Sequence, residues 1–280
     1  MPRKIVLAGE GGHGVQTVAK IIAQAAQKSG KISTYLPSFG VEQRGGVSLA
    51  FLQISQSPIL YPKFHQAEMI VCFSNRSIKA VKDFIKENTL LIYDNSAIET
   101  PYLEKIKNQI TNYLAVPALK IAREKYSIKS ANMIILGAIM AHLKEIDFGN
   151  VEKEIIIDLK DKIAQKPEIK DLNLNALKEG LNWAENFDKE KVKFEGLVPP
   201  QVERKFSFKH SEEDISWERF PEYCKGCGLC LLECPVQALK FSEDSGFLGT
   251  PLPIVDKEKC IGCLKCQYIC PDGAIKVEKV

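Results

Sequence analysis

Two cysteine runs near one end of the 280-residue chain constrain its fold most strongly. The first extends from Cys224 to Pro235 and the second from Cys260 to Pro271, and both have the spacing C-x2-C-x2-C-x3-C-P. Thiolates three residues apart converge on one face and suit three irons of a [4Fe-4S] cube, while the fourth ligand of each cube comes from the other run. The spacing therefore predicts two clusters, the first held by Cys224, Cys227, Cys230 and Cys270 and the second by Cys260, Cys263, Cys266 and Cys234.

Other uses of these cysteines fit the pattern less well. Disulfides are disfavoured in a reducing compartment, and zinc sites usually take cysteine pairs separated by a longer loop. Gly226 and Gly262 permit a tight turn beside each cube. All four thiolates of each cube are supplied by the chain, and the module offers no side-chain base, nucleophile or open metal site. The sequence thus indicates electron carriers, with no catalytic residue.

The cysteines also indicate how the chain divides. Eight of the nine lie between Cys224 and Cys270, and Cys72 is the only one in the first 220 residues. Paired prolines and the loss of apolar periodicity mark residues 196–205, because proline bars helix continuation. We expect one domain over residues 1–195, a linker over residues 196–214, and an iron–sulfur domain over residues 215–280.

Composition excludes several classes of protein. Hydrophobic residues make up 45% and charged residues 26% of the chain, which is typical of a globular protein. A net charge of +3 gives no argument for binding nucleic acid. The apolar runs are too short to span a membrane and the start of the chain lacks a signal-peptide core, so we expect a cytoplasmic protein without membrane insertion.

The first 195 residues alternate strand-like and helix-like segments. Strands are predicted over residues 4–8, 32–36, 47–54, 69–73 and 90–93, and helices after residue 15 and over residues 78–86, 117–126, 131–143 and 171–187. This alternation predicts a three-layer α/β domain with a mainly parallel sheet, followed by a small α+β ferredoxin-type domain.

A glycine-rich loop follows the first predicted strand. Gly9, Gly11, Gly12 and Gly14 lie between that strand and a helix, where backbone N–H groups can bind a phosphate. A nicotinamide dinucleotide site is disfavoured because residues 34–38 lack the acidic residue that binds ribose, and Val15 and Gln16 exclude a Walker loop. Two alternatives stay open: a phosphate-bearing ligand, or a turn that only lets strand and helix pack closely.

A second polar loop spans residues 39–46 and contains Glu42 and Arg44 between glycines. Loops often carry function, although a charged loop is commonly just solvated. Cys72 is interpreted as a small buried hydrophobic residue. The Asp94-Asn-Ser96 segment after a predicted strand suits either a ligand contact or a simple turn.

Three motifs together resemble a known family. Residues 9–15, 39–46 and 132–138, joined to the two-cluster module, are similar to the gamma subunit of the 2-oxoacid:ferredoxin oxidoreductases fused to its delta, ferredoxin-type subunit. The resemblance covers nearly the whole chain. His13 stands where many relatives have glutamine, so a contact made by that side chain does not carry over.

The resemblance implies a reaction in which a 2-oxoacid and coenzyme A give an acyl-CoA, CO₂ and two electrons. It implies that thiamine diphosphate and Mg²⁺ are bound by partner alpha and beta subunits, since this chain lacks the thiamine motif that begins Gly-Asp-Gly. The glycine loop, with Glu42 and Arg44, would help to hold coenzyme A, and a soluble ferredoxin or other low-potential acceptor would take the electrons. Alternatives are a subunit of an indolepyruvate-type oxidoreductase or a non-catalytic nucleotide-sensing ferredoxin.

Overall fold

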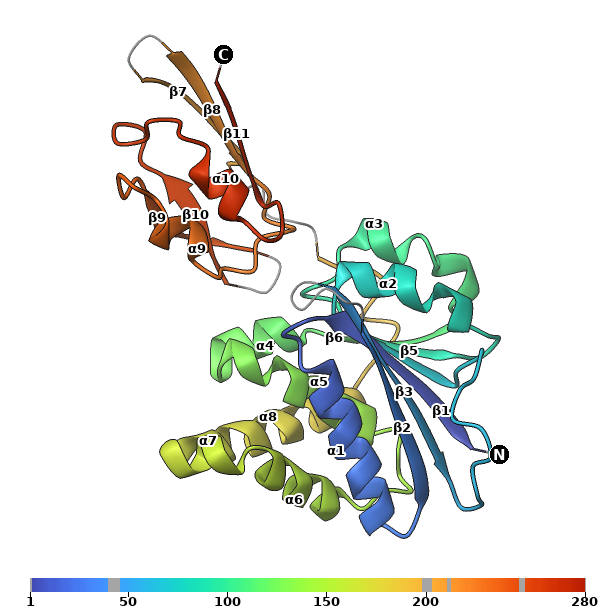
Figure 1. Ribbon diagram of the computed structural model, residues 1–280. Coiled ribbons are helices and arrows are strands. Elements are labelled where there is room, and N and C mark those ends of the chain that lie inside the picture. The colour runs from blue at the N-terminus through green and yellow to red at the C-terminus, as the bar shows by residue number, and fades with distance from the viewer. Residues whose placement is uncertain (1, 40–45, 198–202, 211–212, 247–249, 280) are drawn as a thin grey trace. The chain divides into compact units, whose positions relative to one another are not determined.

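The computed structural model describes residues 2–39, 46–197, 203–210, 213–246 and 250–279 (Figure 1). The chain forms two compact units, Met1–Val198 and Pro199–Val280. No helix in the described parts of the chain is both long and apolar enough to cross a bilayer.

A six-stranded sheet forms the centre of the first unit, in the order β2-β3-β1-β4-β5-β6. β1, β4, β5 and β6 run parallel, whereas β2 and β3 pair antiparallel with their neighbours. The mainly parallel sheet predicted from the alternation is confirmed. The strands are β1 (Arg3–Glu10), β2 (Ile32–Phe39), β3 (Val47–Ser55), β4 (Met69–Cys72), β5 (Leu90–Asp94) and β6 (Asn112–Val116).

Helices cover both faces of this sheet, which makes the three layers. Ile5 and Leu7 of β1 pack into one hydrophobic core with α1, α4, α5, α6 and α8, whereas Val6 and Ala8 pack into a second core with α2 and α3 (Figure 1). A strand buried on both faces needs a continuous apolar run, as residues 5–8 provide. The helices are α1 (Val15–Lys28), α2 (Asn75–Val81), α3 (Thr100–Leu103), α4 (Ala118–Lys125), α5 (Ala131–Met140), α6 (Phe148–Asp158), α7 (Lys160–Gln165) and α8 (Glu168–Glu185), with 3₁₀ turns at Lys82–Phe84, Lys107–Gln109 and Ile128–Ser130.

Two glycines let α5 and α8 pack with their backbones in contact. A Cβ atom on Gly137 would overlap the carbonyl oxygen of Leu177, and one on Gly180 would overlap that of Ile134. Gly137 belongs to the 132–138 motif. Close helix packing therefore explains the glycine in that motif.

The second unit contains an internal structural repeat. One half consists of α9 (Leu229–Leu232) and the β9 (Leu239–Ser245) and β10 (Pro251–Val255) pair, and the other of α10 (Lys265–Ile269) and β11 (Ile275–Lys279) paired with β8 (Glu213–Arg219). Both α10 and β11 start 36 residues after α9 and β9, which is the offset of the two cysteine runs. This small α+β unit agrees with the predicted ferredoxin-type domain.

One part of the expected linker is wrong. β7 (Lys205–His210) lies inside residues 196–214 and pairs antiparallel with β8, with Phe206 opposite Trp217. The sequence of this segment looks polar because its two apolar residues, Phe206 and Phe208, alternate with polar ones. Pairing with β8 is what covers these two side chains. Leu197, at the start of the expected linker, belongs to the first unit, where its N–H donates to the Ile98 carbonyl at 2.8 Å.

Candidate functional site

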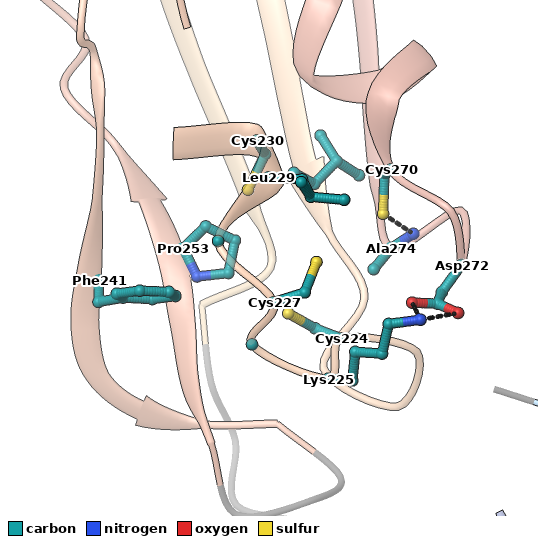
Figure 2. A pocket seen from close by; sticks show the side chains of 13 residues that line it. Cys224, Lys225, Cys227, Leu229, Cys230, Phe241, Pro253, Cys270, Asp272 and Ala274 are labelled. Atoms are coloured by element: carbon teal, nitrogen blue, oxygen red, sulfur yellow. Dashed lines mark hydrogen bonds and ion pairs between the residues drawn. The ribbon is translucent and has the colours of Figure 1, made fainter. Parts of the chain in front are cut away.

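Two pockets in the second unit are each lined by four cysteines. Cys224, Cys227, Cys230 and Cys270 line the first cysteine pocket, and Cys234, Cys260, Cys263 and Cys266 line the second cysteine pocket. Figure 2 shows the first set, in which Cys230 lies on α9 and Cys270 at the end of α10. The structure thus brings the eight residues together in the two predicted sets of three and one, while their role as ligands stays a prediction.

Left-handed backbone conformations build both cysteine loops in the same way. Positive φ angles occur at Gly226 and Gly262 (65° and 62°), and again at Gly228 and Leu264 (76° and 63°). Each pair is separated by the repeat offset of 36 residues. Glycine reaches this region without a steric penalty, and Leu264 adopts it at the cost of some strain. The turns place three cysteines of each run around one pocket.

Backbone N–H groups point at the sulfur atoms. Ala238 N–H donates to Cys234 Sγ and Ala274 N–H to Cys270 Sγ, both at 3.2 Å. The Gly226 and Gly262 N–H groups donate to Cys224 and Cys260 and lower their thiol pKa values, against the larger effect of burial. These donors favour negative charge on sulfur, as an iron–sulfur cluster requires.

Burial has the opposite effect on the free thiols. It raises the pKa of Cys230 to about 12 and the pKa of Cys266 to about 11. Thiols in such surroundings ionise when a cation supplies compensating charge. The donor set therefore fits thiolate ligands of bound iron.

The shape of the pockets bears on the kind of metal group. Each pocket is lined by the loop of one cysteine run together with the last cysteine of the other run. No group of three or more His, Cys, Asp or Glu side chains in the described parts of the chain is arranged to hold a single metal ion. A [4Fe-4S] cube takes four thiolates, so four cysteines lining one pocket suit such a cluster.

A nearly buried ion pair lies in the lining of the first pocket. Lys225 Nζ lies 2.9 Å and 2.6 Å from the two carboxylate oxygens of Asp272, and both side chains are nearly buried in the pocket lining (Figure 2). Sequence reasoning missed this pair, although Lys225 lies inside the first cysteine run. Only the fold shows that Asp272, after the second run, meets it.

The glycine loop of the first unit lies between β1 and α1. Gly14 has φ 74° at the start of α1, and a Cβ atom there would overlap the side-chain amide of Asn132. A Cβ atom on Gly9 would come within 2.7 Å of Val15. Gly9 and Gly14 are thus required for packing, and the loop meets the 132–138 motif through Asn132.

The middle of this loop is open. Gly11 and Gly12 are exposed, Gly12 has φ 108°, and a Cβ atom on Gly12 would have no neighbour within 4 Å. Gly11 N–H donates to the Gly46 carbonyl at 3.2 Å. His13 Nδ1 accepts a hydrogen bond from the Glu10 N–H at 3.0 Å, and burial lowers the pKa of His13 to about 4, so the ring is neutral. Phosphate binding at Gly12 stays a prediction.

The other predicted residues have different outcomes. Glu42 and Arg44 lie outside the described residues. Cys72 is fully buried, and burial raises its pKa to about 12, as expected of a small hydrophobic residue. Asp94 accepts hydrogen bonds from the N–H and hydroxyl of Ser96 and from the Leu119 N–H, so this segment forms a turn that caps α4.

The fold and the two cysteine pockets define an α/β domain joined to an iron–sulfur module of ferredoxin type. Residues 4–183 match the family described as "Pyruvate ferredoxin/flavodoxin oxidoreductase", and residues 223–274 match the "4Fe-4S dicluster domain". The chain therefore belongs to the pyruvate ferredoxin/flavodoxin oxidoreductase family and carries a domain of the kind that binds iron–sulfur clusters.

Similar proteins are named as subunits of such enzymes. The chain is 29% identical over 182 residues to ketoisovalerate oxidoreductase subunit VorA of Methanothermobacter marburgensis, covering 65% of this chain but only 36% of that subunit. It is 29% identical over 183 residues to the pyruvate/ketoisovalerate oxidoreductases common subunit gamma of Pyrococcus furiosus, covering 64% of this chain and 96% of that subunit.

A solved structure shares the fold. It is the 2-oxoglutarate:ferredoxin oxidoreductase from Magnetococcus marinus, with 2-oxoglutarate, coenzyme A and succinyl-CoA bound. The TM-score is 0.59 and the identity 22%, over 74% of this chain and 35% of that one.

Proposed function

We propose that this chain is the electron-transfer and active-site-covering subunit of a thiamine diphosphate-dependent 2-oxoacid:ferredoxin oxidoreductase. The observation that carries the proposal is the presence of two four-cysteine pockets on a chain whose first unit belongs to this oxidoreductase family. In the reaction, a 2-oxoacid anion and coenzyme A give an acyl-CoA, CO₂, one proton and two electrons. The two four-cysteine sets would each hold a one-electron carrier, which suits a two-electron oxidation.

The ligand sets follow the two pockets. Cys224, Cys227, Cys230 and Cys270 hold one [4Fe-4S] cluster, and Cys260, Cys263, Cys266 and Cys234 hold the other. The backbone N–H groups of Ala238 and Ala274 stabilise the negative charge that each cluster gains on reduction. The chain itself needs no acid, base or nucleophile for this role.

The carbon chemistry takes place in alpha and beta partner subunits, which bind thiamine diphosphate and Mg²⁺. The Gly-Asp-Gly string that begins the thiamine motif is absent from the sequence. The acceptor is a soluble ferredoxin or another low-potential protein. Support comes from the relatives, which are themselves named as subunits.

The exposed middle of the glycine loop contacts the phosphates of coenzyme A in this proposal. Gly12 suits that contact because it has a positive φ and an open side that a ligand can approach. Gly12→Ala should therefore raise the KM for coenzyme A. Gly30→Ala is a matched control, since Gly30 also has a positive φ (73°) and free space around a Cβ atom but lies at the other end of α1.

The complex purified without oxygen tests the proposal. It is incubated with coenzyme A and, in turn, pyruvate, 2-oxoglutarate, branched-chain and aryl 2-oxoacids, and both acyl-CoA and reduced low-potential dye are measured. We expect one acyl-CoA for every two electrons with at least one of these acids. A complex that holds both clusters and thiamine diphosphate but forms no acyl-CoA from any of them would overturn the proposal.

A further inference from the structure

Trp217 has an unusual position in the second unit. It lies on β8, its side chain is fully buried, and it lines the second cysteine pocket. The indole Nε1 atom is buried, with no fully formed hydrogen bond to any protein atom. A buried N–H donor without an acceptor costs free energy, so this atom calls for a partner inside the pocket.

A cysteine of the second set can act as the acceptor. The indole N–H lies within reach of the Cys266 sulfur, and this contact lowers the pKa of that thiol, against the larger effect of burial. The contact falls short of full hydrogen-bond geometry in the structure. A thiolate bonded to iron is a stronger acceptor than the neutral thiol, so binding of the cluster would complete the bond.

Among the described residues, the lining of the first pocket contains no equivalent of this donor. Backbone N–H groups donate to sulfur at matching positions in both pockets, at Ala274 in the first and Ala238 in the second. Among the described residues that line the first pocket, Lys225 is the charged side-chain donor, and both oxygens of Asp272 hold its ammonium group. The indole is therefore an additional donor that distinguishes the second pocket from the first.

We propose that the Trp217 N–H donates to sulfur at the second cluster, at the Cys266 thiolate, and raises the reduction potential of this cluster. One-electron reduction adds negative charge to the cluster, and a hydrogen bond to sulfur stabilises the charged form more than the oxidised form. This inference rests on the ligand sets of the proposed function.

Trp217→Phe removes the N–H donor and keeps most of the aromatic body. In this variant we expect the equilibrium constant for reduction of the second cluster to fall about tenfold. This corresponds to a midpoint potential that is lower by about 59 mV for a one-electron couple. The other cluster should keep its midpoint potential. The measurement is a redox titration of the full chain, followed by electron paramagnetic resonance, with iron content determined on the same sample.

Phe206→Leu is the matched control. The Phe206 ring packs on Trp217 with centroids 5.6 Å apart, so this variant disturbs the packing but leaves the N–H in place. Both midpoint potentials should stay unchanged. An equal shift in both variants would show that packing, and not donation, sets the potential.

A second measurement needs no substitution. In the wild-type chain labelled with ¹⁵N-indole tryptophan, the reduced second cluster should show a ¹⁵N hyperfine coupling. Trp183 already donates its N–H to the Ala115 carbonyl at 2.9 Å and should contribute none. Intact clusters with no coupling and no shift in Trp217→Phe would overturn this inference alone, whereas a wild-type chain that binds no clusters would overturn the proposed function.

Discussion

Two titratable groups of the first unit, His13 and Asp94, should give opposite pH dependences of stability. Burial lowers the pKa of His13 from 6.5 to about 4 and raises the pKa of Asp94 from 3.8 to about 6. Between pH 4 and 6.5 the unfolded state binds more protons at His13, so acidification destabilises the fold through this group. Between pH 3.8 and 6 the folded state binds more protons at Asp94, so acidification stabilises the fold through that group.

The two contributions partly offset each other. From pH 7 to pH 5, these pKa values give a loss of up to about 2 kcal/mol through His13 and a gain of about 1 kcal/mol through Asp94. The loss of stability through His13 is an upper value, because part of the His13 side chain remains in contact with solvent. Single substitutions should separate the two effects.

His13→Gln and Asp94→Asn are the informative variants. The glutamine oxygen can still accept the Glu10 N–H, and asparagine can still accept from Leu119, but neither side chain titrates. Relative to wild type, acidification from pH 7 to pH 5 should favour the fold by up to about 2 kcal/mol in His13→Gln and disfavour it by about 1 kcal/mol in Asp94→Asn.

Urea unfolding of the full chain in a Trp217→Phe background provides the assay. Trp183 is then the one tryptophan of the chain and reports the first unit. The free energy of unfolding is compared at pH 7 and pH 5 for each variant. Equal pH dependence in all three proteins would refute the assignment of these pKa shifts to the two residues.

Two further predictions concern the second unit. A double variant with Cys234→Ala and Cys260→Ala should retain about four of about eight iron atoms, because both residues belong to the second pocket. A double variant with Cys234→Ala and Cys224→Ala should retain none, because it removes one ligand from each pocket. Equal iron content in the two double variants would contradict the ligand sets. Gln237 and Gly273 occupy equivalent positions with φ 48° and 62°, so Gln237→Gly should stabilise the unit by about 1 kcal/mol and Gly273→Ala destabilise it by a similar amount. Thermal bleaching of the clusters measures both changes, and a shift of the same sign in the two variants would contradict the argument from backbone strain.

The cysteine sets could be predicted from sequence because the spacing itself encodes the geometry. Three thiolates within seven residues share one loop, and the internal repeat pairs each loop with the end of the other run. Trp217 could not be recognised in the same way. It occupies an ordinary buried position of an alternating strand, and only the fold shows that it lines the second cysteine pocket.

In the first unit, too, some features could be predicted from the sequence and others could not. Continuous apolar runs at residues 5–8 and 69–72 were sufficient to predict buried strands, and the mainly parallel sheet is confirmed. The glycine loop could not be interpreted fully, because phosphate binding and close packing require the same residue type. The contact between Gly14 and Asn132 comes from residues more than a hundred positions apart.

The most direct test of the central claim is native mass spectrometry of the tagged chain, purified without oxygen from its host, with thiamine and iron analysis of the same sample. The account predicts that two further subunits and thiamine diphosphate are recovered with the chain, together with about eight iron atoms per copy. Recovery of the chain alone, with its iron but without thiamine diphosphate or partner subunits, would contradict its role as the electron-transfer subunit of a 2-oxoacid oxidoreductase.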